Sequence, residues 1–363
     1  MIPPVSTPTA PVAEPAVEDK PSEAAVSADD LPDRIWIAWE EQRRTLNLSG
    51  RMRARLRLCL DERRGWLRYP LSISKTVALL ARQQGRTVIV QNPSMVLAAL
   101  ACLLKRTLGY TLVVDRHSNF GFLAPSGKAG LKRRLSDLLS GYTLRHADLT
   151  VVTNQELRAI VEEAGGRAFV LPDPFPELPL MLRKPSPNGL AAGRRPMEIL
   201  FVSSWAFDEP IAETIEACRR MKGEAVVRIT GRMKPEYARM VAEAPENFIA
   251  TGFLSDADYF DLMARSDAVM AVTRRAATLV CGGYEAAVLG KPLILGDSQA
   301  LREYFHAGAV HTDGTAEDLE RQIRLLISDL PNYAEGIRRF HAQRAEEWEG
   351  KLADLESTIR ELR

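Results

Sequence analysis

The tetrad Gly282–Gly283–Tyr284–Glu285 holds the residues of this 363-residue chain that are best suited to bind a nucleotide. It follows a predicted apolar strand at 269–273, and the pattern predicts a helix from Tyr284 to Gly290. A strand, a glycine loop and a helix start bring backbone N–H groups close to a phosphate. The carboxylate of Glu285, just past the glycines, is placed to accept hydrogen bonds from a ribose. The alternative is a helix–strand turn that simply needs glycine, and this segment alone leaves both open.

Two further polar loops in the second half of the chain follow predicted strands. Ser203, Ser204 and Trp205 end the strand at 198–203, and Arg232 follows the strand at 225–230. Open α/β sheets bind their ligands at the carboxyl ends of strands. Three such loops together supply N–H donors, a cation for a diphosphate and a carboxylate for a ribose. This combination predicts a nucleotide site better than any one of the loops does.

Candidates for proton transfer lie in the first half of the chain. His117 follows a predicted strand at 111–115, and Glu40 and Glu41 follow a predicted strand at 35–39. A histidine titrates near neutral pH and is suited to take a proton from a hydroxyl group. A histidine that only hydrogen-bonds a ligand, and glutamates that only mark a helix start, remain alternatives.

Several other chemistries find no support in the sequence. It has no dinucleotide-binding GxGxxG, Walker A, HExxH or GxSxG motif, and its five histidines show no metal-type spacing. Asp256–Ala257–Asp258 resembles the metal-binding DxD of some sugar transferases. However, Ser255 precedes it at a helix start, and Ser-x-x-Asp in that position predicts a capping box. We therefore predict no metal site.

The elements that must position these residues alternate between short apolar strands and helices, which predicts an α/β fold with parallel sheets. Further strands are predicted at 87–91, 149–153, 168–170, 248–250 and 293–295. Helices are predicted at 72–83, 94–107, 130–145, 154–164, 210–222, 234–243 and 256–265.

Composition divides the chain into five parts. Residues 1–33 form an acidic, Pro- and Ala-rich tail that cannot bury a core. Residues 34–171 are expected to form a first α/β domain, and 172–196 a proline-rich linker. Residues 197–331 are expected to form a second α/β domain, and 332–363 a terminal helix that packs across both domains.

Residues 43–75 carry ten Lys or Arg against only Asp61 and Glu62. This local charge predicts an anionic partner, so Arg43, Arg44 and Arg51 are candidates to contact an acceptor phosphate or acidic lipid. A solvated helix face is the alternative. A nucleic acid is disfavoured because few aromatic residues interleave with the basic ones.

Two further features bear on localisation. The longest apolar run, 95–104, is too short to span a bilayer. The four dispersed cysteines fit a reducing compartment. We therefore expect a cytoplasmic protein, and the basic segment described above predicts a peripheral position on the inner face of the membrane.

At the level of whole motifs, the sequence resembles the glycosyltransferases of the GT-B fold. It looks closest to the β-mannosyltransferases that extend chitobiosyl-diphosphate lipids, and to bacterial polysaccharide-synthesis relatives. The resemblance extends from 87 to 326 and is carried by VIVQNPS, LVVDRHSNFGF, ADLTVVTNQELR, FVSSWAFDE, ITGRMKPEY, FLSDADYFDLMARSD and GGYEAAVLGKP.

The resemblance implies two Rossmann-like domains that face a cleft and are crossed by a C-terminal helix, with 34–171 on the acceptor side and 197–331 binding the nucleotide sugar. It implies transfer of a hexose from a GDP- or UDP-sugar to a lipid-diphosphate-linked or polysaccharide acceptor, without a cofactor or metal. Glu285 matches the glutamate that holds the donor ribose, and His117 matches a histidine beside the donor sugar. The Ser203–Ser204 and Gly282–Gly283 segments match those whose amides approach the diphosphate.

The sequence departs from the family pattern at two places. Thr278 stands where many members place a second glutamate, and Trp205 and Phe207 replace a familiar Arg/Lys pair. Donor identity and stereochemistry therefore stay open, with inversion favoured over retention. A nucleotide-sugar epimerase of the same fold, or a non-catalytic sugar- or nucleotide-binding protein, is the alternative.

Overall fold

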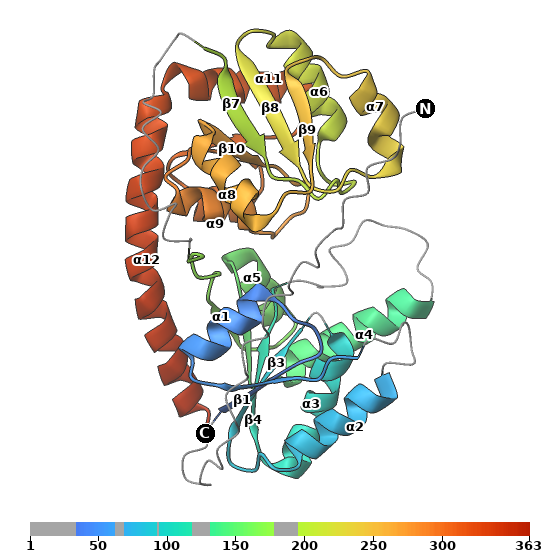
Figure 1. Ribbon diagram of the computed structural model, residues 1–363. Coiled ribbons are helices and arrows are strands. Elements are labelled where there is room, and N and C mark those ends of the chain that lie inside the picture. Colours follow the sequence, from blue (N-terminus) through green and yellow to red (C-terminus); the bar gives the residue numbers. More distant parts are fainter. Residues whose placement is uncertain (1–33, 62–68, 93, 118–130, 178–194) are drawn as a thin grey trace, which may run out of the picture. The chain divides into compact units, whose positions relative to one another are not determined.

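The computed structural model describes residues 34–61, 69–92, 94–117, 131–177 and 195–363, apart from the side chains of residues 131–133. Predictions that fall on the tail, on most of the linker and on residues 118–130 lie outside these residues. The described part contains two parallel sheets of six strands each, flanked by helices (Figure 1).

The first sheet has the strand order β2-β1-β3-β4-β5-β6. Its strands are β1 (Arg34–Ala38), β2 (Arg55–Leu58), β3 (Thr87–Gln91), β4 (Thr111–Asp115), β5 (Leu149–Val152) and β6 (Ala168–Val170). Its helices are α1 (Arg43–Arg51), α2 (Tyr69–Leu80), α3 (Met95–Leu108), α4 (Leu131–His146) and α5 (Gln155–Glu163). The order reverses between β1 and β3, which makes their carboxyl ends the switch point of this sheet.

The second sheet has the order β12-β11-β10-β7-β8-β9 and its switch point lies between β10 and β7. Its strands are β7 (Met197–Phe201), β8 (Ala225–Thr230), β9 (Phe248–Gly252), β10 (Ala268–Ala271), β11 (Leu293–Gly296) and β12 (Ala309–Thr312). Its helical segments are α6 (Ile211–Arg220), η5 (Pro235–Tyr237), α7 (Ala238–Ala242), α8 (Asp256–Arg265), α9 (Cys281–Val288), α10 (Gln299–Tyr304) and α11 (Ala316–Ser328).

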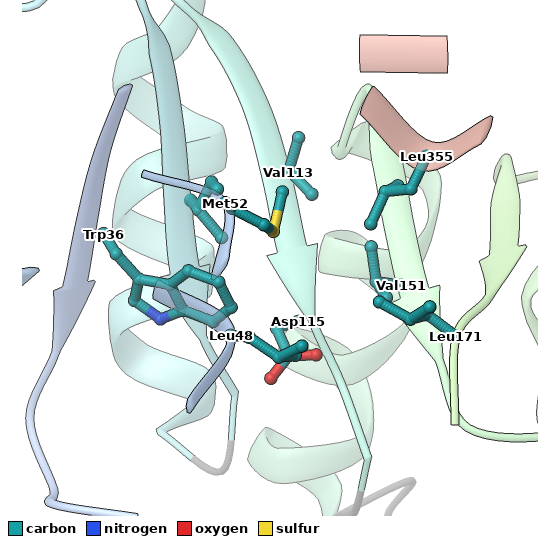
Figure 2. A pocket seen from close by; sticks show the side chains of 9 residues that line it. Trp36, Leu48, Met52, Val113, Asp115, Val151, Leu171 and Leu355 are labelled. Carbon is teal, nitrogen blue, oxygen red and sulfur yellow. The ribbon is translucent and has the colours of Figure 1, made fainter. Parts of the chain in front are cut away.

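Helices cover both faces of the first sheet. One apolar cluster joins Val88, Val90 and Leu112 of the sheet to Leu80 of α2 and Leu97 of α3. On the opposite face, Trp36 and Val113 pack with residues of α1 and of the last helix, α12 (Leu330–Glu361). Within that face a cavity of about 10 Å³, room for roughly one water molecule, is ringed by side chains that include Trp36, Met52 and Asp115 (Figure 2).

The terminal helix α12 contributes to both cores. Ile337 and Phe340 pack with α9 and β11 of the second sheet, whereas Trp348 and Leu355 pack on the first. Trp348 also donates its indole N–H to the carbonyl of Pro172 at 3.0 Å.

The architecture confirms the predicted α/β fold with two parallel sheets, and it adds elements that the sequence analysis missed. The segment interpreted as a basic stretch contains α1 and β2, and β12 adds a sixth strand to the second sheet. Among the described residues, no helix combines the length and apolarity needed to cross a bilayer.

Candidate functional site

Glu285 lies at the switch point of the second sheet because α9 packs directly on the end of β7. A Cβ atom on Gly282 would come within 3.0 Å of the side chain of Val202, the residue after β7. Val202 in turn donates its N–H to the carbonyl of Met270 in β10 at 2.9 Å. The first turn of α9 is thereby fixed above the gap between β10 and β7, where open α/β sheets bind ligands.

The Glu285 side chain is only 8% exposed, and its carboxylate is held from two sides. Tyr259 of α8 donates its hydroxyl to one oxygen at 2.6 Å, and Arg43 of α1 lies 3.4 Å from the other. Burial raises the pKa of Glu285 above its ordinary value, against the opposing effects of the Tyr259 hydrogen bond and the Arg43 charge. Because a carboxylate has about four acceptor positions, Glu285 keeps capacity for ribose hydroxyls.

The two glycines beside Glu285 do not form the predicted loop. The helix begins at Cys281, so both glycines lie in its first turn and are buried. A Cβ on Gly283 would lie 2.8 Å from the Phe305 ring, which is closer than van der Waals contact allows. The glycines are therefore required for close packing of α9, and their approach to a phosphate stays a prediction.

Tyr284 and Trp205, both predicted to bind the donor, are core residues. Tyr284 is 3% exposed and its ring packs against Phe175 and Phe305, with centroids 5.7 and 5.6 Å apart. Trp205 is fully buried and donates its indole N–H to the carbonyl of Thr230 at 3.0 Å. Neither side chain has much surface to offer to a ligand, so a contact with the donor would come from the main chain of these residues, and both assignments stay predictions.

The Ser203–Ser204 loop already encloses an anion, namely the carboxylate of Glu209. The Ser203 and Ser204 hydroxyls donate to Glu209 at 2.5 and 2.9 Å. The amides of Ser204 and Ala206 donate to it at 3.1–3.3 Å. These donors have the arrangement that binds a phosphate oxygen, but Glu209 occupies them, which the sequence analysis did not foresee.

The loop that follows β10 is linked to the same region. Asp208 accepts hydrogen bonds from Thr273 at 2.5 Å and from Arg275 at 3.1 Å. A cavity of about 370 Å³ opens beside this loop, at the carboxyl ends of β10, β11 and β12. Its lining includes Arg274, Arg275, Ser298 and Glu156 of α5. Its size and mixed polarity suit a small polar ligand.

Two further predictions concern Arg232 and the helix start at Ser255. Arg232 is exposed after β8, with its guanidinium 5.8 Å from the centre of the Phe253 ring, and its role at a diphosphate stays a prediction. Ser255 accepts a hydrogen bond from the amide of Asp258 at 3.2 Å and donates its hydroxyl to the Asp258 carboxylate at 2.7 Å, which confirms Ser255 as the cap of α8.

The candidates for proton transfer lie at the carboxyl edge of the first sheet. Glu40 and Glu41 follow β1, and His117 follows β4. Nδ1 of His117 is 3.6 Å from Asp115, close enough for an ion pair if the ring is protonated. This nitrogen is buried and makes no hydrogen bond within the described residues. The catalytic roles of the three residues stay predictions.

The basic residues predicted to face an acceptor or a membrane are engaged in other contacts. Arg44 is buried and bonds Asp115 at 3.0 Å and Asp173 at 2.7 Å, so its assignment to that surface was wrong. Arg43 contacts Glu285, and Arg51 bonds Glu349 of α12 at 2.7 Å.

The Arg44 contact sets the state of the Asp115 carboxyl. Burial acts to raise the pKa of Asp115, but the Arg44 charge and hydrogen bonds override it and lower the pKa to about 2. Asp115 is therefore a carboxylate at neutral pH.

No group of three or more His, Cys, Asp or Glu side chains within the described part of the chain has the arrangement of a metal site. Because polar loops follow the predicted strands, the sequence predicted that Glu285 and His117 lie at the carboxyl ends of the sheets. It did not predict the contact of Tyr259 with Glu285 or of Glu209 with the serine loop, because no periodic pattern links these residues.

Comparison with known proteins agrees with this architecture. Residues 22–172 match the family model described as a glycosyl transferase 4-like domain. No curated protein matches the sequence.

Solved structures match over most of the chain. The structure of HepE from Anabaena with UDP is 15% identical and has a TM-score of 0.67, over 90% of this chain and 99% of that one. Sucrose-phosphate synthase from Thermosynechococcus elongatus is 14% identical with a TM-score of 0.64, over 82% and 78%. A glycosyltransferase from Rickettsia africae is 14% identical with a TM-score of 0.58, over 90% and 89%. These similarities, with the two six-stranded sheets, establish the GT-B fold.

Proposed function

We propose that this protein is a glycosyltransferase that moves a hexose from a nucleoside-diphosphate sugar to a lipid-diphosphate-linked or glycan acceptor. The observation that carries the proposal is the buried carboxylate of Glu285 at the switch point of the second sheet. A carboxylate in this position is suited to bind two ribose hydroxyls, and Tyr259 fixes its orientation. HepE, which shares the fold, has been solved with UDP and with UDP-glucose, which supports a UDP-sugar as the first donor to test.

The diphosphate would lie between the start of α9 and the loop after β7. Unpaired N–H groups and the helix dipole favour an anion at a helix start. The donors that now bind Glu209 would bind phosphate oxygens once Glu209 turns away. Arg232 would supply a positive charge to the leaving diphosphate without a metal ion. The sugar would extend into the cavity beside Arg274 and Arg275.

His117 would act as the base that takes the proton of the acceptor hydroxyl in an inverting transfer. The carboxylate of Asp115, 3.6 Å away, would stabilise the imidazolium that forms. Glu40 and Glu41, at the same sheet edge, are the second candidates for this role.

A thermal-shift panel tests the donor side of the proposal. UDP-, GDP- and dTDP-sugars are each compared with the corresponding free nucleotide, in the wild type and in Glu285→Ala. We expect one base to raise the melting temperature of the wild type and not of the variant. Release of nucleoside diphosphate upon addition of a polyprenyl-diphosphate-linked sugar would then show transfer. Conversion of the nucleotide sugar to an epimer without an acceptor would favour the epimerase.

A further inference from the structure

The helical layer formed by α2, α3 and α4 exposes leucine side chains on its outer face. On α4, Leu135 and Leu138 are 55% and 69% exposed. They are three residues apart, so they lie on the same side of the helix. Leu71 in the first turn of α2 and Leu103 on α3 are also exposed. Exposed apolar side chains that adjoin on one face and are bordered by polar residues are typical of interaction sites.

The three helices form one continuous layer on a single face of the first sheet. The helix α3 contacts both α2 and α4, and the three helices lie side by side in Figure 1. Ser136 of α4 lies 3.5 Å from the sulfur of Met95, and Cys102 lies 4.0 Å from the carbonyl of Thr143. These contacts show that α3 and α4 run in the same direction. The outer sides of the helices therefore belong to one surface.

The same layer is basic. Among the side chains that the structure describes, α2, α3 and α4 hold one acidic residue, Asp137, and five Lys or Arg, namely Lys75, Lys105, Arg106, Arg134 and Arg145, of which Lys105 pairs with Asp148 at 2.6 Å. On α4, the exposed Arg134 and Arg145 flank the two leucines along the helix. Apolar side chains bordered by cations fit the interface of a bilayer with anionic lipids, where leucines enter the acyl region and cations meet headgroups.

The arginines that the sequence favoured for this role have other partners. Arg44 is buried, Arg43 reaches Glu285, and the Arg51 guanidinium lies over the Trp348 ring at 4.9 Å while bonding Glu349. A second basic surface within the described residues is on the opposite face of the first sheet, in the layer formed by α2, α3 and α4.

We propose that the outer face of α2, α3 and α4 docks onto an anionic lipid bilayer, with Leu135 and Leu138 entering the acyl region. This inference rests on the proposed function, because it explains how an enzyme without a described spanning helix reaches a lipid-linked acceptor. In a parallel α/β sheet the helix after a strand starts at the carboxyl edge. Leu135 and Leu138 lie in the first half of α4, so the docking face adjoins the edge that carries His117.

Flotation with lipid vesicles tests the docking face. The full-length protein is mixed with vesicles of phosphatidylcholine alone or with 30 mol% phosphatidylglycerol, and the bound fraction is measured. We expect binding only to the anionic vesicles. The double substitution Leu135→Gln/Leu138→Gln should lower binding at least about tenfold, because two leucines no longer enter the acyl region. Arg134→Ser and Arg145→Ser should each lower it several-fold.

Leu325→Gln on α11, where the leucine is 48% exposed, is the matched control and should bind vesicles like the wild type. The nucleotide thermal shift is measured on the same samples and should be retained in the double variant, which separates docking from donor binding. The proposal would be overturned if the wild-type protein did not bind anionic vesicles, or if the double variant bound them as well as the wild type. It would also be overturned if the double substitution only converted a dimer to a monomer, as measured by light scattering.

Discussion

The buried Arg44–Asp115 pair holds the end of β4, from which His117 extends, and it makes a defined prediction for stability. Asp115 is 1% exposed, and its pKa falls from 3.8 to about 2 in the folded protein. A difference of nearly two pKa units corresponds to a contribution on the order of 2 kcal/mol to folding. Because the folded-state pKa is the lower one, this contribution is fully present above about pH 5. It is lost as the pH falls toward 2.

The substitution Asp115→Asn keeps the shape of the side chain and removes its charge. Among the described residues, Arg44 then retains Asp173 as its one anionic partner. Leaving a buried charge short of its partner costs on the order of 3 kcal/mol. We expect a loss of unfolding free energy of this size at pH 7. This difference between variant and wild type should become smaller between pH 5 and pH 3, because protonation of Asp115 removes its contribution to the stability of the wild type in that range.

Urea denaturation followed by tryptophan fluorescence measures this difference, since Trp36 and Trp348 lie in the same apolar cluster. Asp354→Asn, at an exposed position on α12, serves as the control and should behave like wild type. A deficit for Asp115→Asn that is equally large at pH 7 and pH 3 would refute the argument that Arg44 keeps the carboxyl ionised.

Three further predictions concern the candidate site. Gly283→Ala should destabilise the protein by about 1–3 kcal/mol through overlap with Phe305, and Phe305→Leu should restore part of the loss in a double-mutant cycle. Glu209→Gln should raise the affinity for nucleoside diphosphate in calorimetry, because a neutral side chain competes less for the loop donors; a lower affinity would make Glu209 a support of the loop. His117→Gln should lower turnover at least about tenfold with little change in donor affinity, and the reverse pattern would make His117 a donor ligand.

The sequence predicted most strands of both sheets because their apolar, β-branched runs are short and separated by helical stretches. It missed α1 and β2 because their arginines were interpreted as surface charge. In the structure Arg44 turns inward to Asp115, and Arg55 and Arg57 alternate with the leucines of β2. Alternation of charged and apolar residues is a strand pattern that the net charge obscured.

The site was predictable in its position and less so in its contacts. Strand ends indicated where Glu285 and His117 lie, since parallel strands bring their carboxyl ends to one edge. The interior position of Trp205 depends on a left-handed backbone, with φ of 57°, that nothing in its neighbours indicates. Glu209 fills the serine loop from the same turn, and a single sequence cannot distinguish a carboxylate that occupies donors from one that faces solvent.

The most direct test of the account is calorimetric titration of the nucleoside diphosphate found in the panel into wild type, Glu285→Ala and the control Glu303→Ala. Glu303 is an exposed carboxylate on α10. Loss of charged hydrogen bonds to the ribose should weaken binding to Glu285→Ala at least about tenfold while the fold is retained, and Glu303→Ala should bind like wild type. Equal affinity of wild type and Glu285→Ala would contradict the assignment of this carboxylate to the donor nucleotide.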